Sequence, residues 1–377
     1  FYRDDTHQKV RSTDDVFDIY ERAVGGNSTF LLNIPPNRDG KFSPADVAVL
    51  KGTGQRIRET YGTDLFRQAE GPKEVLDQNA DTYVTVDKDG PGIVISTPQP
   101  VTLNRLVLQE AIATNGERVE KHAVDAWIDG GWKEIAHSTN IGYKRILRFP
   151  DVTTDKIRVR ILESRLTPAI CTISAHHYKA RPPRLSAQRN MDGLVTIEPM
   201  PQEFGWKAHG ENIAENLNAG FKIYYTTDGT EPSAGSTEYK DPFQMGNNEL
   251  KAVAILNGEK GAILQERFGL VKKEWKVIGK TAQFLAIDLG SEHILSGFAF
   301  TPQKQGDKGT VAGIIRISND GKNWKEMESF EFGNLINDPS KRYHHFKQMV
   351  KARYIQVEAA EIAARTEADA LAGIDIF

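Results

Sequence analysis

Two pairs of adjacent carboxylates near the start of this chain could do chemistry. Asp4-Asp5 and Asp14-Asp15 each place two acidic side chains together, and such groups can act as general acids and bases. The second pair follows Ser12-Thr13, a sequence typical of a helix start, where acidic residues interact favourably with the helix dipole. We therefore interpret both pairs as loop charges and helix caps, and we predict no catalytic residue among them.

Histidine and cysteine residues offer a second kind of chemistry, metal binding. His176-His177 and His344-His345 lie in strand-like stretches, where adjacent side chains point to opposite faces, so one ion could not readily bind both rings of a pair. Cys171 is the single cysteine and lies in an apolar run, which favours a small buried side chain. The sequence contains no P-loop, GxGxxG, GxSxG or HExxH motif. These observations predict no metal site and no cofactor.

Three tryptophans could stack on sugar rings, namely Trp127, Trp132 and Trp324. The last two occupy equivalent positions in a repeat described below, which favours a core role for both. Trp127 stays open between the two interpretations.

The composition is that of a globular protein with more than one domain. The chain has 377 residues, of which 39% are hydrophobic and 26% charged, and two to four domains are expected. A net charge of −3 gives no electrostatic reason to expect nucleic acid as a partner. No run of about 18 apolar residues is present, so no membrane span is predicted. The chain starts at Phe1 without Met or a signal segment, and we expect processing upstream.

Residues 1–62 have the pattern of an α/β fold. Ser12 to Ala23 predicts a helix that ends at Gly25-Gly26, and the apolar run Thr29 to Ile34 predicts a strand buried on both faces. Pro35-Pro36 ends that strand, and Ser43-Pro44 starts a second helix that ends near Tyr61. One helix–strand–helix unit is too small to stand alone.

From Thr63 onward short strand-like runs dominate. They predict a β-sandwich over residues 63–179, a small immunoglobulin-like β domain over 180–272, and a further β domain over 273–377. The last segment repeats the first sandwich: Leu106 corresponds to Phe298 and Trp132 to Trp324, and both pairs are separated by 192 positions. The sequence thus predicts two copies of one sandwich with a different domain between them.

Residues 10–40 carry a specific string. Leu31-Leu32-Asn33-Ile34-Pro35-Pro36, followed by Asn37-Arg38-Asp39-Gly40, resembles the last part of the catalytic barrel of family twenty-nine glycoside hydrolases, the α-L-fucosidases. Residues 64–178 look like the β-sandwich that follows the barrel in that family. The resemblance implies that residues 1–62 are the C-terminal remnant of a (β/α)8 barrel, of which roughly the last of eight units is present.

Two further resemblances cover the rest of the chain. Tyr225-Thr226-Thr227-Asp228-Gly229, with Pro232, resembles the C-terminal domain of chitobiases, and residues 284–377 resemble a discoidin-like (factor V/VIII type C) module. The expected fold is mainly β and multidomain: a barrel remnant, then two discoidin-like (galactose-binding-like) β-sandwiches separated by a small immunoglobulin-type domain.

The fucosidase resemblance implies retaining hydrolysis of terminal α-L-fucose from fucosylated glycans by two carboxylates. Neither family carboxylate matches a position of this chain, so we predict that the 377-residue chain alone is inactive. Two alternatives stay open: a non-catalytic carbohydrate-binding protein, and purely structural spacer domains. Family analogy also implies a bacterial protein that is secreted, periplasmic or on the cell surface.

The resemblance suggests substrate contact at few residues. Phe1, Tyr2 and Asn33 are the candidates, because all would lie near the carboxyl ends of barrel strands; Asp39 is a weaker one. A structural role for Asn33 in the Pro35-Pro36 turn is the favoured alternative. A structural calcium ion would fit the discoidin-like resemblance. However, Trp275 to Gly279 runs almost directly into Thr281, without the segment that usually supplies ion- and ligand-adjacent loops.

Overall fold

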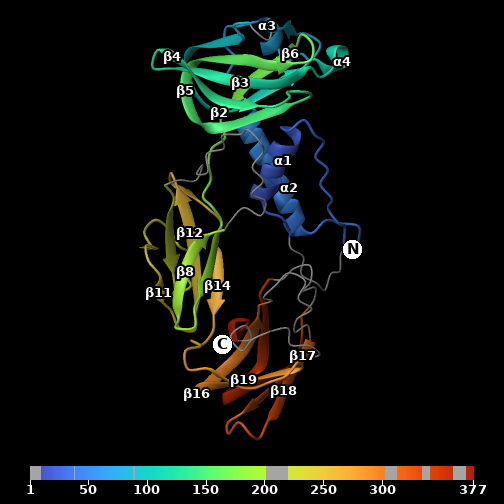
Figure 1. Ribbon diagram of the computed structural model, residues 1–377. Coiled ribbons are helices and arrows are strands. Elements are labelled where there is room, and N and C mark those ends of the chain that lie inside the picture. Colours follow the sequence, from blue (N-terminus) through green and yellow to red (C-terminus); the bar gives the residue numbers. More distant parts are fainter. Residues whose placement is uncertain are drawn as a thin grey trace. The chain divides into compact units, whose positions relative to one another are not determined.

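The computed structural model describes residues 10–37, 39–87, 90–200, 220–301, 312–332, 340–359 and 371–377. These residues form two compact units, one made of residues 10–180 and the other of residues 181–200 and 220 onward. The strands and helices are drawn in Figure 1, and each unit is described by itself.

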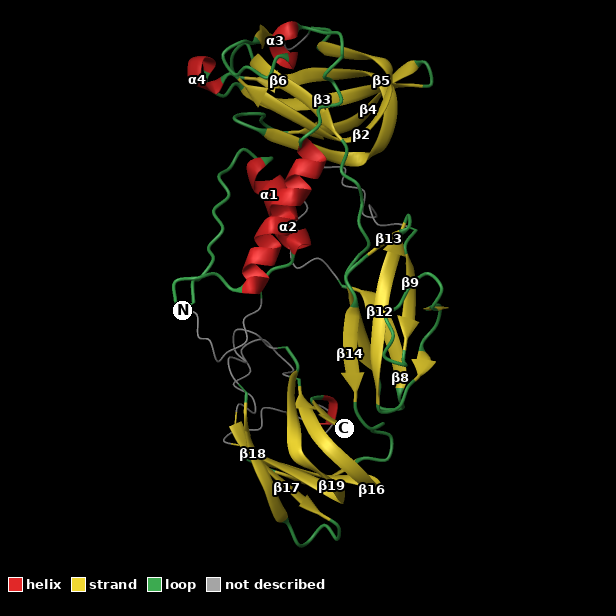
Figure 2. Ribbon diagram, turned by 180° about the vertical axis from the view of Figure 1, so that it is seen from behind, coloured by secondary structure: helices red, strands yellow, loops and turns green. Residues whose placement is uncertain are grey.

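Both predicted helices of the first unit are present. Helix α1 (Thr13–Val24) begins after Ser12, whose Oγ accepts a hydrogen bond from the Asp15 backbone N–H at 3.1 Å. Helix α2 (Pro44–Tyr61) begins in the same way after Ser43, with proline at its first position. Figure 2 shows the two helices side by side, next to a β-sandwich.

The predicted strand Thr29 to Ile34, buried on both faces, is absent from the structure of this chain, where that expectation was wrong. Residues 28–37 form no strand, and Leu31 is 81% exposed. A parallel strand is stabilised by hydrogen bonds to neighbouring strands, and the described part of the first unit offers no strand next to this segment. The segment is nevertheless bounded by the two helices, as predicted.

The first sandwich is built from one six-stranded sheet with long, bent strands. The strand order is β1-β6-β2-β5-β3-β4. The strands are β1 (Val84–Thr85), β2 (Ile93–Glu110), β3 (Val119–Ile128), β4 (Gly131–Ser138), β5 (Arg145–Ser164) and β6 (Ala169–His176), with short helices α3 (Lys73–Leu76) and α4 (Ile112–Asn115). Alternate side chains of β2 and β5, such as Leu106 and Ile157, fill one apolar core.

The small β domain of the second unit packs two sheets around its own core. One sheet has the order β11-β8-β7, and the other has the order β10-β9-β12-β13 with β14 paired to β12. The strands are β7 (Leu185–Arg189), β8 (Leu194–Pro199), β9 (Lys222–Thr226), β10 (Thr237–Glu238), β11 (Phe243–Gln244), β12 (Asn248–Leu256), β13 (Glu259–Lys260) and β14 (Leu264–Phe268). Leu185, Val195 and Leu250 are buried between the sheets.

The last sandwich repeats the strand order β2-β5-β3-β4 of the first as β16-β19-β17-β18, in agreement with the predicted repeat. Its order is β15-β16-β19-β17-β18, with β20 paired to β16. The strands are β15 (Lys276–Lys280), β16 (Phe284–Phe300), β17 (Ala312–Ser318), β18 (Lys325–Glu331), β19 (Arg342–Ala359) and β20 (Ile374–Ile376). Leu106 in β2 and Phe298 in β16 are both fully buried at equivalent positions. The fold is therefore mainly β and multidomain, with two related sandwiches around a small β domain.

A buried ionic cluster joins the small β domain to the last sandwich. Lys341 Nζ lies 2.8 Å from Glu266 Oε1 of β14 and 2.8 Å from Asp375 Oδ2 of β20. Lys272 Nζ lies 3.0 Å from Asp375 Oδ1, on the other oxygen of the same carboxylate. Close by, the Leu270 backbone N–H donates to the Ile376 carbonyl at 2.6 Å. These contacts fasten the two domains of the second unit at the C-terminus of the chain.

Candidate functional site: the joint between the helix pair and the first sandwich

A highly buried pair of opposite charges lies where α1 meets the first sandwich. Arg105 of β2 donates to Glu21 of α1 through Nε (2.6 Å to Oε1) and Nη2 (3.2 Å to Oε2). The two side chains are 2% and 3% exposed. A bidentate arrangement compensates much of the desolvation of both groups, because every charged atom has a partner.

Three more side chains complete this cluster. Arg148 Nη1 lies 2.8 Å from Asp18 Oδ1 and 3.6 Å from Glu21 Oε2. The Tyr61 hydroxyl, at the end of α2, donates to Glu21 Oε1 at 2.6 Å. Burial, and then the negative charge of Glu21, raises the pKa of Tyr61 well above its ordinary value, so the phenol stays a donor. The cluster therefore ties both helices to the sheet.

Aromatic rings surround the ion pair. The Arg105 guanidinium lies 4.9 Å from the centroid of the Tyr178 ring, and Tyr178 stacks on Phe17 of α1 at 5.4 Å. His176 contacts Tyr61 edge to face, and its Nδ1 lies 2.8 Å from the Thr63 carbonyl oxygen. Rings of this kind exclude water, which strengthens the electrostatic interaction between the charges.

A second set of contacts holds the chain just after α1. Asn27 Nδ2 donates to Glu117 Oε2 at 3.1 Å, and Asn27 Oδ1 accepts from the Tyr143 backbone N–H at 2.6 Å. The amide of Asn27 lies directly against Gly142, where a Cβ atom would come within 2.2 Å of it. Gly142 also has φ = +63°, a conformation that favours glycine. The sandwich is thus anchored at the amino end of segment 28–37.

The predicted substrate-contact residues lie elsewhere. Asn33 is exposed in the extended segment, and the structure does not bring it to the ionic cluster. Phe1 and Tyr2 lie outside the described residues, as do Asp4 and Asp5. The turn after Pro36 is made by Asn37, whose Oδ1 accepts from the backbone N–H groups of Asp39 and Lys41. Asn33, Phe1 and Tyr2 stay predictions.

Three carboxylates of α1, those of Asp14, Asp18 and Glu21, are engaged in ion pairs. Asp14 pairs with Arg56 of α2, and Asp18 accepts from Arg22 at 2.7 Å as well as from Arg148. The sequence analysis missed Glu21 and Arg105. A signal was present: Arg105 interrupts the apolar run Leu103 to Leu108, and a charge inside such a run requires a buried partner.

The histidine pairs behave as the strand pattern predicts. His176 is buried, whereas the His177 side chain is 38% exposed and lies 3.4 Å from Asp151. Burial lowers the pKa of His176, which favours the neutral ring. Among the described residues, no three His, Cys, Asp or Glu side chains come together in a group that could hold a metal ion.

The tryptophans were predicted less well. Trp132 and Trp324 are only partly buried, so the expected core role was wrong for both. Trp127 and Trp132 face each other across the β3–β4 hairpin, edge to face, with ring centroids 5.3 Å apart. They flank a turn whose two central residues, Asp129 and Gly130, both have positive φ. Such cross-strand aromatic pairs stabilise hairpins, and here the role is structural.

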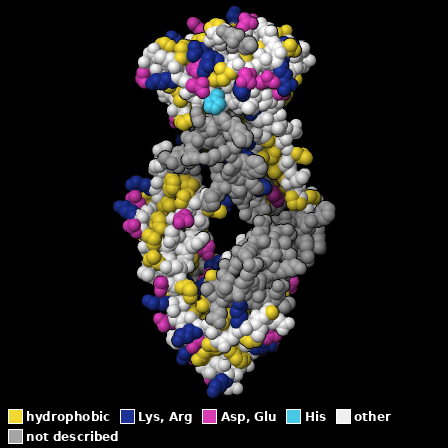
Figure 3. Space-filling model, viewed as in Figure 1, with side chains coloured by type: hydrophobic (Ala, Val, Ile, Leu, Met, Phe, Trp, Pro, Cys, Tyr) yellow, Lys and Arg dark blue, Asp and Glu magenta, His cyan; other side chains and the backbone are white. Residues whose placement is uncertain are grey.

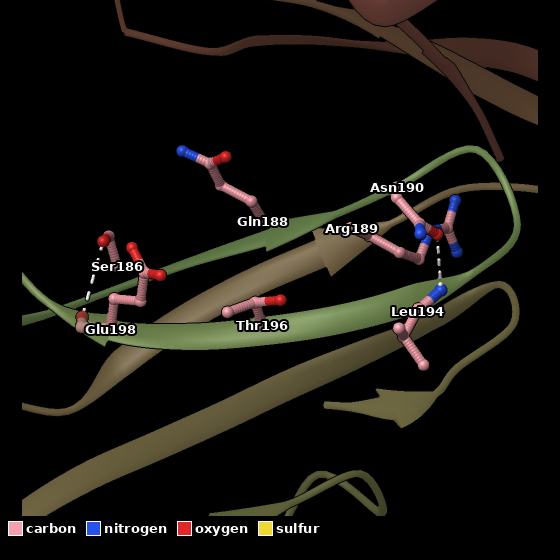
Figure 4. A pocket seen from close by; sticks show the side chains of 7 residues that line it. All are labelled: Ser186, Gln188, Arg189, Asn190, Leu194, Thr196 and Glu198. Atoms are coloured by element: carbon pink, nitrogen blue, oxygen red, sulfur yellow. Dashed lines mark hydrogen bonds between the residues drawn. The ribbon is translucent and has the colours of Figure 1, made fainter. Parts of the chain in front are cut away.

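A polar trough lies on the small β domain. Its lining comes from β7, β8 and the turn between them (Figure 4): Ser186, Gln188, Arg189, Asn190, Leu194, Thr196 and Glu198. Arg189 is occupied by the carbonyls of Met245, Gly246 and Leu270. The lining has no aromatic ring on which a sugar could stack.

Lys/Arg and Asp/Glu side chains are interspersed over the face of the first sandwich that Figure 3 shows.

Comparison with known proteins finds similarity to parts of this chain. The F5/8 type C domain model matches residues 247–369, and the Fn3-associated model matches residues 213–268. Over 174 residues the chain is 28% identical to α-L-fucosidase 1 of Arabidopsis thaliana, a match that covers 41% of this chain and 34% of that protein. The chain spans about a third of the length of the curated relatives it matches.

Solved structures give related matches. A glycoside hydrolase 29 family member from an unknown rumen bacterium is 20% identical, with a TM-score of 0.42, over 100% of this chain and 52% of that one. A Ruminococcus gnavus GH29 fucosidase, solved in complex with fucose, is 24% identical, with a TM-score of 0.41, over 45% of this chain and 38% of that one. No described helix is both long and apolar enough to cross a membrane. The sequence matches agree with the predicted resemblance: part of this chain is similar to a portion of two plant α-L-fucosidases, and an F5/8 type C domain model matches residues 247–369.

Proposed function

We propose that this chain is the C-terminal part of a retaining exo-α-L-fucosidase that removes terminal α-L-fucose from fucosylated glycans. In this proposal residues 1–62 complete the catalytic barrel, and residues 63–179, 180–272 and 273–377 are accessory domains. One observation carries the proposal: the two helices are fastened to the first sandwich by the buried Glu21–Arg105 pair, while the segment between them lacks a partner strand among the described residues.

The burial of that segment supports a strand role. Phe30, Leu32 and Ile34 are half-buried, whereas Thr29, Leu31 and Asn33 are exposed. An alternation with period two is the pattern of an extended strand with one covered face. An exposed leucine in the uncovered face is unfavourable in water, and barrel strands pack such residues inside. We propose that Thr29, Leu31 and Asn33 form the inner face of the completed barrel.

Asn33 would then lie near the carboxyl end of a barrel strand, where barrel active sites form. We propose that Asn33, together with Phe1 and Tyr2, contributes to the sugar-binding surface there. Retaining hydrolysis needs two carboxyl groups on opposite sides of the glycosidic bond, one as acid/base and one as nucleophile. Asp14, Asp18 and Glu21 of α1 are held in ion pairs. The proposal takes both catalytic groups from outside this chain, which alone is inactive.

Fucose release from an aryl α-L-fucoside tests the proposal. We expect no release by the purified 377-residue chain, and release by a longer polypeptide that adds an upstream barrel domain to it. Replacement of Asn33 by Ala in the longer polypeptide should raise KM or lower kcat. The proposal fails if the 377-residue chain, free of contaminating enzyme, is active or if the longer polypeptide cleaves other glycosides but not fucosides.

A second candidate is carbohydrate binding without hydrolysis, in the last sandwich, and the F5/8 type C match favours it. The short β15–β16 connection, which leaves three residues between Lys280 and Phe284, argues against a large binding loop there. A titration of the 377-residue chain with fucosylated oligosaccharides discriminates the two. Saturable binding supports this candidate, and a flat response leaves the accessory domains with a structural role. We also propose that the protein resides outside the cytoplasm, and fractionation of the source cells tests this.

A further inference from the structure

The two sandwiches have one charged position in common. In the first, the register between β3 and β4 shifts between Val124 and Asp125, and in the second, the register between β17 and β18 shifts between Ile315 and Arg316. The bulge therefore lies at the same place in both sheets, and Asp125 and Arg316 occupy equivalent positions. The charge at this position is negative in one sandwich and positive in the other.

In the first sandwich the partners on β5 are positive. Arg160 donates to both oxygens of Asp125, from Nε at 2.6 Å and from Nη2 at 2.8 Å. Arg158, directly opposite Asp125, donates from Nε at 2.8 Å. The Asp125 side chain is 3% exposed, so these two cations account for its burial on the sheet.

In the second sandwich the equivalent partner is negative. Arg316 Nη1 pairs with Glu358 of β19, which stands in the register position of Arg160. Gln356 stands in the position of Arg158, directly opposite Arg316. The ion pair is thus kept and its polarity is reversed.

The apolar positions next to this pair are nearly the same in both sandwiches. Val159 and Val357 hold one equivalent core position of β5 and β19, and Ile157 and Ile355 hold the next. These two positions of β5 and β19 therefore offer no discrimination if a strand of one sandwich pairs with a strand of the other during folding. Chains with repeated domains commonly misassemble in this way.

We propose that the reversed ion pair prevents strand exchange between the two sandwiches. If β3 paired with β19, Asp125 would lie next to Glu358, and if β17 paired with β5, Arg316 would lie next to Arg158 and Arg160. Like charges at neighbouring cross-strand positions destabilise a sheet, whereas each native pairing unites opposite charges. The repulsion acts against the wrong pairing and leaves the correct one intact.

An exchange of charge sets in the full 377-residue chain tests this proposal. R316D/Q356R/E358R gives the second sandwich the charges of the first, and D125R/R158Q/R160E gives the first the charges of the second. The six-fold combination exchanges both sets, so the sandwiches differ again. Each variant is unfolded in guanidinium chloride, refolded by dilution at several protein concentrations, and analysed by size-exclusion chromatography with light scattering. Hydrogen exchange of the monomer fraction detects mispairing within one chain.

We expect each triple variant to lower the yield of native monomer about two- to tenfold, and the six-fold variant to return it to within about twofold of the natural chain. The fold-loss of monomer yield in the six-fold variant could instead equal the product of the fold-losses in the two triple variants. Each charge set would then act locally, and the proposal would be overturned. Triple variants that refold like the natural chain would also overturn it. If a triple variant gives no monomer, the monomer yield of the six-fold variant still decides the question, because the six-fold variant contains the same three substitutions.

Discussion

Glu21 and Arg105 lie 84 positions apart in the chain and form a bidentate ion pair with side chains that are at most 3% exposed. The pair joins a helix of the region that resembles a barrel to the sheet of the following sandwich. Because the joint is buried and hydrogen-bonded, we expect the two elements to unfold together.

The first prediction concerns this joint. Arg105→Met leaves the Glu21 carboxylate buried without its main partner, which should destabilise the first unit by about 3–5 kcal/mol. The E21L/R105M double variant removes both charges and should lose much less. Hydrogen exchange of α1 amides reports the effect locally. Lys121→Ala, which breaks an exposed pair with Glu163, serves as the control and should cost at most about 1 kcal/mol. A loss for Arg105→Met as small as that of the control would contradict the structural role.

A second prediction concerns pH. His122 is fully buried in β3, its Nδ1 lies 2.7 Å from the Thr139 carbonyl oxygen, and burial lowers its pKa to about 4. Above about pH 6.5 both the folded and unfolded chains hold this ring neutral, so stability is complete. As pH falls from about 6.5 to 4 the unfolded chain takes up the proton first, and the first unit should lose about 3 kcal/mol.

Chemical denaturation at pH 7, 5.5 and 4 measures this loss. His122→Leu should flatten the dependence, apart from a smaller contribution of His176, whose pKa burial also lowers. His137→Leu, at a side chain that is 46% exposed, is the matched control and should keep the full slope. An unchanged slope in the His122 variant would exclude this ring as the cause.

A third prediction concerns the joint in the second unit. Asp375→Ala leaves Lys272 and Lys341 without their shared carboxylate, and both lysines are largely buried. We expect a loss of about 3–5 kcal/mol, seen as faster hydrogen exchange in β14 and β20 together. Asp192→Asn removes an exposed carboxylate 4.0 Å from Lys273 and should change exchange little. Faster exchange in β20 alone would show that the two domains are not coupled through this residue.

A fourth prediction separates the isolated chain from the complete barrel. In the 377-residue chain, Leu31→Asp changes an 81% exposed side chain, so stability should stay within about 0.5 kcal/mol and self-association should fall. In a longer polypeptide with an upstream barrel, the same change places a charge in a packed interior and should strongly lower thermal stability. Thermal unfolding and light scattering of both proteins decide the outcome. Equal effects in the two would argue against a barrel strand at residues 29–34.

Much of the local structure was predictable because it depends on neighbouring residues. Ser12 and Ser43 cap the two helices, since a hydroxyl next to the first turn satisfies free backbone N–H groups wherever it occurs. The repeat between the sandwiches was also predictable, because alternation and the 192-residue interval preserve the order of strands in the chain.

The tertiary structure decided what depends on residues far apart in the chain. The Thr29 to Ile34 run has the sequence of a buried strand, yet it stays unpaired, because strand formation needs a neighbour that the described residues do not supply. Trp132 and Trp324 look like core residues but lie at hairpin ends, where burial depends on the bulge and the turn. Glu21 and Arg105, and likewise Asp125 and Arg160, became partners through folding alone, since no local pattern says which distant charge a buried charge will meet.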